Sequence, residues 1–307
     1  MPAPVATIDI RGLSHAYGGR PALIDFDLSV ARGELVAVLG PNGSGKTTLF
    51  RVLSTLVPLQ TGVATIAGCD LARQTAEIRR RLGVVFQAPS LDRKLTVVEN
   101  LRIQAALYGL RGRELARRID ELLGRFGLAD RAGELTERLS GGLRRRVELA
   151  KGLLHGPAVL LLDEPSTGLD PAARNELWRY LQELRRTDGT TILLTTHYLD
   201  EAEDADRIAI LSAGRLVAWG SPAELKATVA GDAITVETAE PEALAAEMTA
   251  ALAVPARVVE GAVRLEVPGG HHWIPRIVEA FPGRVRAIRL GQPTLEDVFI
   301  DRTGKRF

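Results

Sequence analysis

Short apolar runs and helix-forming stretches alternate along most of this chain, and the alternation predicts an α/β protein. Runs dominated by apolar residues at 35–39, 159–163 and 191–196 have the length of strands and are too short for helices. Such runs indicate strands that are covered on both faces, as in a parallel sheet. Helix starts follow at Thr47 and at Asp170-Pro171, where an aspartate cap precedes a proline in the first turn.

The pattern is different near the N-terminus, where residues 5–33 combine short β-like pieces with turns. The pieces at 6–10 and 23–30 flank a Gly18-Gly19 turn. Short strands joined by glycine turns indicate neighbouring antiparallel strands. We therefore expect an antiparallel sheet at the edge of the core.

A helical segment interrupts the β/α alternation in the middle of the chain. The sequence Thr96-Val-Val-Glu99 is a capping box and predicts a helix that runs to about residue 110. A second helix is predicted over residues 114–126, where apolar residues recur at helical spacing. We expect an inserted helical subdomain at about 90–155. Its many arginines are interpreted as a solvated face.

The C-terminal part has the composition of a small separate domain. From residue 233 to 290, β-like pieces and helical stretches follow one another, and residues 293–300 predict a capped helix at the end. We expect two domains, residues 5–229 and an α+β accessory domain at 230–307. A metal site at His271 and His272 is not favoured, because no further His or Cys stands nearby at ligand spacing.

Composition limits the possible settings of the protein. Its 307 residues suffice for two domains, and 46% hydrophobic residues allow a large core. The formal net charge of +1 gives no sign of a nucleic-acid-binding surface. The single Cys69 excludes an internal disulfide framework and fits a reducing compartment. No signal peptide and no apolar run of membrane-spanning length is evident, so we expect any span to come from another chain.

The strongest chemical signal is a phosphate-binding loop between a strand and a helix. The pattern G-x-x-x-x-G-K-[ST] places Gly40, Gly45, Lys46 and Thr47 at the required spacing. Backbone N–H groups of such a loop bind phosphate oxygens, and the helix N-terminus adds partial positive charge. Lys46 can reach the β- and γ-phosphates, and the Thr47 hydroxyl can bind Mg²⁺. The sequence therefore predicts nucleoside triphosphate binding by the whole loop: Gly40, Pro41, Asn42, Gly43, Ser44, Gly45, Lys46, Thr47 and Thr48.

Polar side chains at the ends of other strands predict the hydrolytic chemistry. Asp163 ends an apolar strand and can hold Mg²⁺, and Glu164 can polarise the attacking water. His197 follows the next strand and can reach the γ-phosphate at the same sheet edge. Gln87 ends the strand at 83–87, where its amide can hold Mg²⁺ or the water. For His197 and Gln87, a purely structural role stays open from the residues alone.

Two further features indicate either a contact with a nucleotide or an ordinary structural role. Ser140, Gly141 and Gly142 open a helix and form either a second anion site or an ordinary capped turn. Tyr17 offers a flat face for an adenine ring, or is simply an aromatic residue in a turn.

The order of these motifs resembles that of the ATP-binding cassette (ABC) ATPases over residues 5 to about 229. The resemblance rests on the phosphate loop, Gln87, Leu-Ser-Gly-Gly at 139–142, Leu-Leu-Leu-Asp-Glu-Pro at 160–165, Ser-Thr-Gly-Leu-Asp at 166–170, and His197. It implies a RecA-like core with an antiparallel β subdomain and a helical subdomain. It also implies ATP and Mg²⁺ as ligands. For the nucleotide, it implies that Tyr17 stacks on adenine and that Ser140, Gly141 and Gly142 form the signature loop. For the chemistry, it implies that Asp163 is the Walker B aspartate, Glu164 the catalytic base, Asp170 the D-loop aspartate and His197 the switch histidine, and that Gln87 links Mg²⁺ to a membrane partner.

One departure concerns the fifth position of the signature, where Leu143 replaces the usual glutamine. The serine and glycines are intact, so we expect ATP clamping to survive. In the resembling family a signature loop faces ATP held by another subunit. The single set of motifs therefore implies a dimer with two ATP molecules, most simply a homodimer.

The C-terminal sequence resembles the ATPases of daunorubicin-resistance and related drug, antibiotic and lipid exporters. This implies an ATP hydrolase that drives export through a separate transmembrane permease and lies at the cytoplasmic face of the membrane. A soluble ABC ATPase acting on ribosomes or DNA is the alternative. Such proteins usually carry two cassettes or a long coiled coil, which this chain does not show. A phosphate-loop kinase leaves the motifs at 139–142 and 166–170 unexplained.

Overall fold

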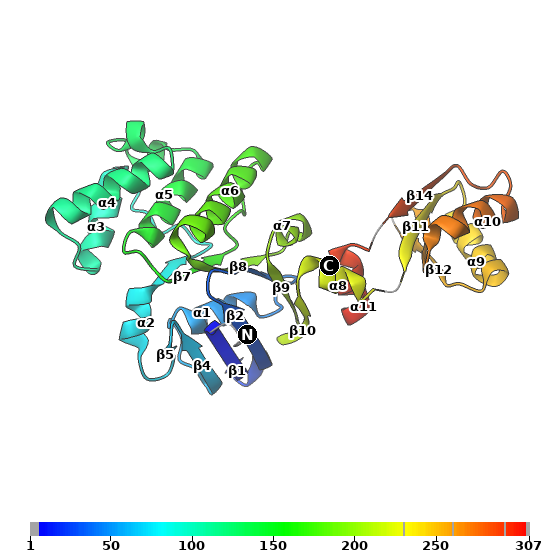
Figure 1. Cartoon of the computed structure of the whole chain (residues 1–307), viewed down its shortest axis with the longest axis horizontal. Helices are drawn as coiled ribbons and strands as arrows, with labels where there is room; N and C mark the ends of the chain where they lie inside the picture. Colours follow the sequence, from blue (N-terminus) through cyan, green and yellow to red (C-terminus); the bar gives the residue numbers. More distant parts are fainter. Residues whose placement is uncertain (1–5, 230, 260, 292, 305–307) are drawn as a thin grey trace. The chain divides into compact units, whose positions relative to one another are not determined.

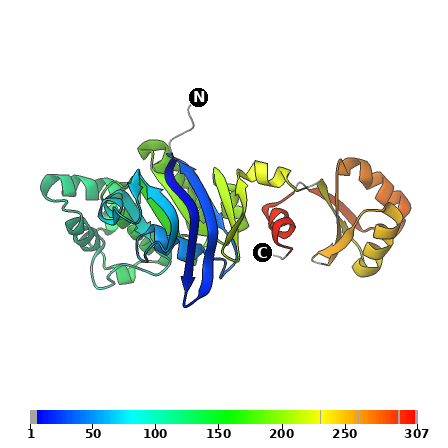
Figure 2. The same cartoon turned by 90° about the horizontal axis from the view of Figure 1, so that it is seen from below.

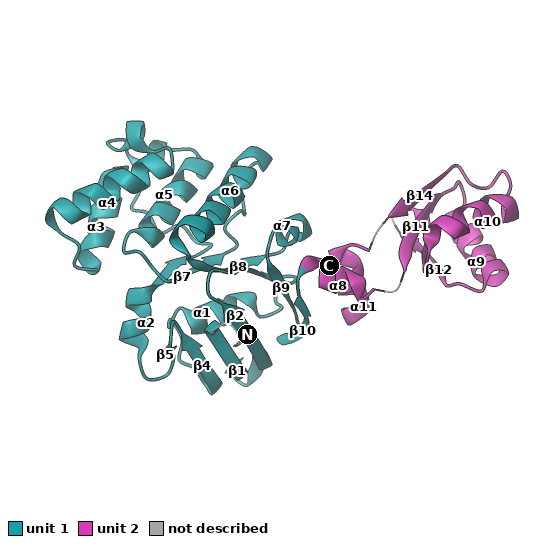
Figure 3. Cartoon of the chain, viewed as in Figure 1, with its two compact units in different colours: residues 1–221 teal, residues 222–307 magenta. Residues whose placement is uncertain are grey.

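The structure is a computed structural model that describes residues 6–229, 231–259, 261–291 and 293–304. The chain divides into two compact units, Met1–Ser221 and Pro222–Phe307 (Figure 3). The sequence-based division at residues 229 and 230 lies inside the second unit. It stays a prediction, since compactness alone does not define a domain boundary.

A six-stranded sheet forms the centre of the first unit (Figure 1). Its order is β10-β9-β3-β8-β7-β6, and only the β9–β10 pair is antiparallel. Every residue of β3, β7 and β8 is buried, as the apolar runs predict. The strands are β3 (Leu35–Leu39), β6 (Leu82–Val85), β7 (Val159–Asp163), β8 (Thr191–Thr196), β9 (Arg207–Ser212) and β10 (Arg215–Gly220).

A second, antiparallel sheet lies in the same unit, with the order β2-β1-β4-β5. Its long β1–β2 hairpin is conspicuous in Figure 2. Residues of both sheets and of helix α1 (Lys46–Leu53) belong to one hydrophobic core, in which Phe26 and Phe50 are fully buried. The shared core fixes α1 and the loop before it. The strands are β1 (Ala6–Tyr17), β2 (Arg20–Ala31), β4 (Thr61–Ile66) and β5 (Cys69–Asp70).

Three helices and two short 3-10 turns form the inserted helical part, drawn in green in Figure 1. The predicted capping box is present, because the Thr96 side chain accepts from the Glu99 amide and Glu99 bonds back to the Thr96 amide. These elements are α3 (Val97–Leu107), α4 (Gly112–Arg125), η1 (Ala129–Arg131), η2 (Thr136–Arg138) and α5 (Gly141–Leu153). The remaining helices of the first unit are α2 (Thr75–Arg81), α6 (Pro171–Asp188) and α7 (Leu199–Glu203).

The second unit has the predicted α+β character and its own core. Helices α9 (Pro241–Leu252) and α10 (Trp273–Ala280) pack on one face of an antiparallel sheet with the order β12-β13-β11-β14. The sheet consists of β11 (Asp232–Glu237), β12 (Ala256–Val259), β13 (Ala262–Val267) and β14 (Ala287–Gly291), and the unit also contains α8 (Pro222–Ala227), η3 (Gly270–His272) and α11 (Leu295–Thr303). In the residues that the structure describes, no helix combines the length and apolar character needed to cross a membrane.

Candidate functional site

The loop at residues 40–48 joins β3 to α1 and depends on three glycines. Gly43 and Gly45 have φ angles of 80° and 112°, which side-chain-bearing residues rarely adopt. A Cβ atom on Gly40 would lie 2.4 Å from the carbonyl oxygen of Leu211. The amides of Lys46, Thr47 and Thr48 open α1 and have no acceptor within the helix. The loop therefore presents backbone donors at the positive end of a helix dipole.

Lys46 is buried at the base of this loop. Its Nζ atom donates to the carbonyl oxygens of Gly40 at 2.6 Å and Pro41 at 3.2 Å, and it lies 3.6 Å from Oε1 of Glu164. Burial lowers the pKa of the Lys46 ammonium, whereas the Glu164 carboxylate opposes that shift. The ammonium is thus held beside the loop, where a phosphate oxygen can replace the weaker contacts.

The two carboxylates that end β7 lie in different environments. The buried Thr195 hydroxyl on β8 donates to Oδ1 of Asp163 at 2.7 Å and accepts from the Glu164 amide at 2.8 Å. Burial raises the pKa of Asp163, and the Thr195 bond opposes this rise. Glu164 has a φ of 44°, which is unfavourable for a residue with a side chain. The two successive carboxylates have different partners, Thr195 for Asp163 and the Lys46 ammonium for Glu164.

Four side chains from four segments converge on the Glu164 carboxylate. Besides Lys46, its Oε2 atom receives Gln87 Nε2 at 3.1 Å and Thr167 Oγ1 at 3.3 Å, and lies 3.4 Å from His197 Nδ1. The parallel strands β6, β7 and β8 deliver Gln87, Glu164 and His197 to the same sheet edge. The structure therefore brings together the three predicted catalytic side chains. Thr167 joins them, although nothing in the sequence singled it out.

A cavity of about 620 Å³ lies over the loop. Its polar lining and glycine cradle suit the phosphates of a nucleotide. A Mg²⁺ ion would be held by Thr47 and Gln87 at the cavity and by Asp163 beside it. No group of three His, Cys, Asp or Glu residues in the described ranges makes a preformed metal site, so phosphate and water would have to complete the coordination. The cavity is lined by Pro21, Ala22, Asn42, Gly43, Gly45, Lys46, Thr47, Thr48, Gln87, Glu164, Thr167 and His197.

The five predicted nucleotide contacts that do not belong to the phosphate loop lie outside that lining, as far as the structure describes the chain. Ser140 caps α5, accepting from the Leu143 amide at 3.3 Å, and Asp170 caps α6, accepting from the Ala173 amide at 2.9 Å. Gly141 and Gly142 form the first turn of α5. Tyr17 is 42% exposed and stands against the His15 ring. Within one chain these residues thus act as caps and surface groups, and their contacts with ATP stay predictions.

Gly40, Pro41, Ser44 and Asp163 also lie outside the lining but adjoin it. Gly40 and Pro41 supply the carbonyls that hold Lys46. Ser44 is 3% exposed, and its hydroxyl has no hydrogen-bond partner within the described residues. An unpaired buried hydroxyl in a phosphate loop is compatible with a ligand that completes the loop.

One arginine of the helical part is not solvated, and the interpretation of these arginines as an exposed face is wrong for it. Arg145 is 9% exposed and donates to backbone carbonyls beside Gln87 and Glu164. The burial of Arg145 is hard to predict from the run Arg144-Arg145-Arg146, because the composition of this run indicates a polar, exposed face. The signal was periodicity, since Arg145 shares a helix face with Leu149 and Gly152 at i+4 and i+7.

Comparison with known families matches both units. Residues 23–167 match the family described as ABC transporter, and residues 220–303 match the family described as ATP-binding protein DrrA1-3-like, C-terminal domain. The chain is 42% identical over 309 residues to the daunorubicin resistance ATP-binding protein DrrA2 of Streptomyces coeruleorubidus, covering 96% of this chain and 94% of that protein. It is 36% identical over 313 residues to the Nod factor export ATP-binding protein I of Cupriavidus pinatubonensis, covering 99% and 93%.

Solved structures share the fold of the first unit. A structure described as the ATP binding subunit of an ABC transporter superposes with a TM-score of 0.66 at 34% identity, covering 72% of this chain and 92% of that one. CbiO1 of Clostridium perfringens, described as part of the ABC transporter complex cbiONQ, gives a TM-score of 0.68 at 28% identity, covering 81% and 96%. The predicted fold class is confirmed.

Proposed function

Because the chain belongs to the ABC transporter ATP-binding family and carries a DrrA-like C-terminal domain, we propose that it powers export of a drug-, antibiotic- or lipid-like compound through a separate permease. The chain is the ATP-hydrolysing subunit of an exporter. The observation that carries the mechanism is the convergence of Lys46, Gln87 and His197 on Glu164 at the phosphate loop.

In this mechanism the loop amides and Lys46 hold the phosphates of ATP, and Glu164 acts as the base. When ATP displaces the contacts that Lys46 and Gln87 make with Glu164, that carboxylate is free to accept a proton from the attacking water. His197, which lies 3.4 Å from Glu164, orients the carboxylate and the γ-phosphate. Thr47, Gln87 and Asp163 would hold a Mg²⁺ ion, which would supply positive charge to the phosphates.

Two subunits complete the site in this proposal. Ser140 and Asp170 stand at the N-termini of α5 and α6, and they do not line the cavity of their own chain in the described residues. The position of Ser140 at the positive end of α5 suits contact with a phosphate of ATP that a second chain holds. A homodimer with two ATP molecules follows, docked on a permease at the cytoplasmic face of the membrane.

The first experiment uses the Glu164→Gln variant of the full chain. We expect it to lose ATP hydrolysis and to form a stable dimer only with ATP in size-exclusion chromatography, because binding persists while the base is absent. The unmodified chain, measured alongside, should hydrolyse Mg-ATP. A variant that still turns over ATP and stays monomeric would reject Glu164 as the base.

The export role is tested separately from the chemistry. Affinity purification from membranes should recover a transmembrane protein with the chain. Recovery with ribosomes or nucleic acid instead would favour the soluble class of ABC ATPase. The formal net charge of +1 favours the first result.

A further inference from the structure

Arg145 on α5 makes an unusual set of backbone contacts beneath the site. Its Nε atom donates to the carbonyl oxygen of Pro165 at 2.8 Å, Nη1 to that of Phe86 at 2.9 Å, and Nη2 to that of Asp163 at 3.4 Å. Only 9% of the residue is exposed. One guanidinium fork thus joins three carbonyls from two chain segments, one around Phe86 and one at Asp163 and Pro165, a geometry that an ammonium cannot reproduce.

These three carbonyls are the immediate chain neighbours of the residues that do the chemistry. Asp163 and Pro165 flank Glu164 on both sides, and Phe86 precedes Gln87. The Gln87 amide in turn lies 3.1 Å from the Glu164 carboxylate. Arg145 therefore fixes the backbone on which both side chains stand, and a small displacement of either would misalign them.

Helix α5 also contacts the loop after Gln87 at a second point, the main chain of Ser90. Glu148 is 6% exposed, binds Arg145 Nη1 at 2.7 Å and accepts from the Ser90 amide at 2.9 Å. Lys151, one turn further, donates to the Ser90 carbonyl at 2.7 Å. Residues spaced by three along α5 thus hold the loop from 86 to 90 to one helix face. The N-cap of that helix is Ser140.

We propose that Arg145 is a positioning residue for ATP hydrolysis, which aligns Gln87 with Glu164 and ties both to the helix that begins at Ser140. The inference rests on the proposed function and adds a physical link to it. Movement of the Gln87 loop when nucleotide binds one site must move α5 or break the Arg145 contacts. Because the N-terminus of α5 faces the other ATP in the proposed dimer, Arg145 links the two sites.

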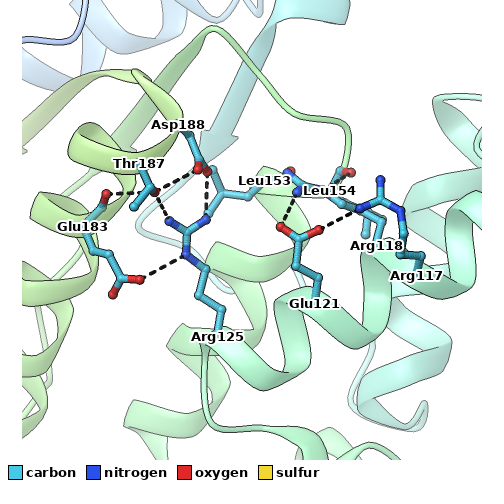
Figure 4. A network of polar contacts seen from close by, with 9 residues as sticks. All are labelled: Arg117, Arg118, Glu121, Arg125, Leu153, Leu154, Glu183, Thr187 and Asp188. Carbon is cyan, nitrogen blue, oxygen red and sulfur yellow. Dashed lines mark hydrogen bonds and ion pairs between the residues drawn. The ribbon is translucent and has the colours of Figure 1, made fainter.

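The structure contains a matched control for this role. Arg118 on α4 donates to the carbonyls of Leu153 and Leu154 at 3.2 and 3.4 Å and pairs with Glu121 at 2.9 Å (Figure 4). It repeats the chemistry of Arg145, a fork on carbonyls with a glutamate three residues later, but none of its contacts adjoins Gln87 or Glu164. Arg118→Lys therefore measures the cost of losing such a fork without disturbing the site.

The experiment compares Arg145→Lys with Arg118→Lys in the full chain. Thermal melting, nucleotide affinity, kcat and the Hill coefficient for ATP are measured for each. We expect both variants to melt earlier, and Arg145→Lys alone to lose about 10- to 100-fold in kcat, with nucleotide affinity changed by less than about threefold. Its Hill coefficient should approach 1. Equal kcat values for the two variants would overturn the role of Arg145.

A double-mutant cycle with Gln87→Ala gives an independent readout. If Arg145 acts through Gln87, Arg145→Lys should cost clearly less kcat in the Gln87→Ala background than in the unmodified chain. If Arg145→Lys costs the same factor in kcat in both backgrounds, the proposed action of Arg145 through Gln87 is overturned. If Arg145→Lys fails to fold, the double variant Arg145→Gln, Glu148→Gln replaces it in both comparisons. This double variant removes both charges of the buried pair, so neither is left without its partner. An unmodified chain that neither binds nor hydrolyses ATP would overturn the proposed function itself, and with it the premise of this inference.

Discussion

Glu164 combines a chemical role with an unfavourable backbone conformation. A φ of 44° brings the Cβ atom of an L-residue close to neighbouring backbone and costs about 1–2 kcal/mol. The surrounding bonds maintain it, since the Glu164 amide is fixed by Thr195 at 2.8 Å. Strain of this kind is characteristic of functional sites, where the chain must turn a side chain toward a ligand.

This strain makes a residue-scale prediction. We expect Glu164→Gly to be more stable than Glu164→Ala by about 1 kcal/mol, because glycine adopts the left-handed conformation without a Cβ clash. Both variants lose the carboxylate, so the comparison isolates the backbone. Urea unfolding of the two proteins measures the difference. An alanine variant as stable as the glycine variant would mean that the strain is relieved elsewhere.

At the same scale, residue identities predicted a candidate site, because loops that bind phosphate need particular residue types, and the structure brings several of its side chains together around Glu164. Gly40, Gly45 and Lys46 stand where only those residues suit the geometry. Thr167 and Arg145 were missed for different reasons. Thr167 lies within the motif at 166–170, but the motif does not indicate that its hydroxyl bonds Glu164. Arg145 owes its burial to the tertiary packing of α5 on the chain around Phe86 and Pro165.

At the scale of elements, a stacked pair of rings joins three segments of the first unit. His155, just after α5, stacks on Tyr108 at the end of α3 with ring centroids 3.7 Å apart, and its Nε2 atom bonds the Leu82 carbonyl of β6 at 3.1 Å. Burial lowers the pKa of His155 to about 4, the Leu82 bond opposes that shift, and Arg118 adds to it. The neutral ring is therefore part of the packing.

This pair predicts a pH dependence of stability. Above about pH 6.5, the ordinary pKa of histidine, the ring is neutral in both states. Between about pH 6.5 and 4 the unfolded chain takes up a proton that the folded chain resists, so the free energy of unfolding falls as pH falls, by up to about 3 kcal/mol. Urea unfolding from pH 7.5 to 5 measures the slope. His155→Phe keeps a stacking ring and should flatten it; an unchanged slope would assign the effect to other groups.

Elements with strong local signals were predicted closely, and those set by distant partners were not. The helix after Thr96 begins at the expected residue because its capping box is local. Strand β1 extends to Tyr17, well beyond the expected end at residue 10. Its outer half pairs with β2 around Gly18 and Gly19 and is stabilised by that ladder. Only the pairing reveals this length, since the residues themselves resemble a loop.

At the scale of the whole molecule, each unit has a core of its own. The larger core draws its buried residues from Ile8 to Leu211, and the smaller from Ile234 to Phe281. We expect a fragment of residues 1–221 to fold and to bind nucleotide with an affinity within about threefold of the full chain. Circular dichroism and nucleotide titration test this. An unfolded fragment would show that the second unit contributes to the stability of the first.

The sequence also predicted an α+β part at the C-terminus, because β-like pieces and helical stretches follow one another there. The boundary itself is harder to place. Helix α8 begins at Pro222, two residues after the end of β10 in the β9–β10 hairpin. Local signals there favour a helix without indicating the unit to which it belongs.

The Ser140 cap has a consequence for molecular recognition. Its oxygen accepts from the backbone amide of Leu143, so the hydroxyl proton is left over and its direction is restricted before any ligand arrives. A phosphate oxygen that approached this helix end would meet a hydroxyl whose oxygen is already held in place, which would lower the entropic cost of recognition. Because this hydrogen bond comes from the main chain of residue 143, the position of the Ser140 hydroxyl does not depend on the side chain at residue 143.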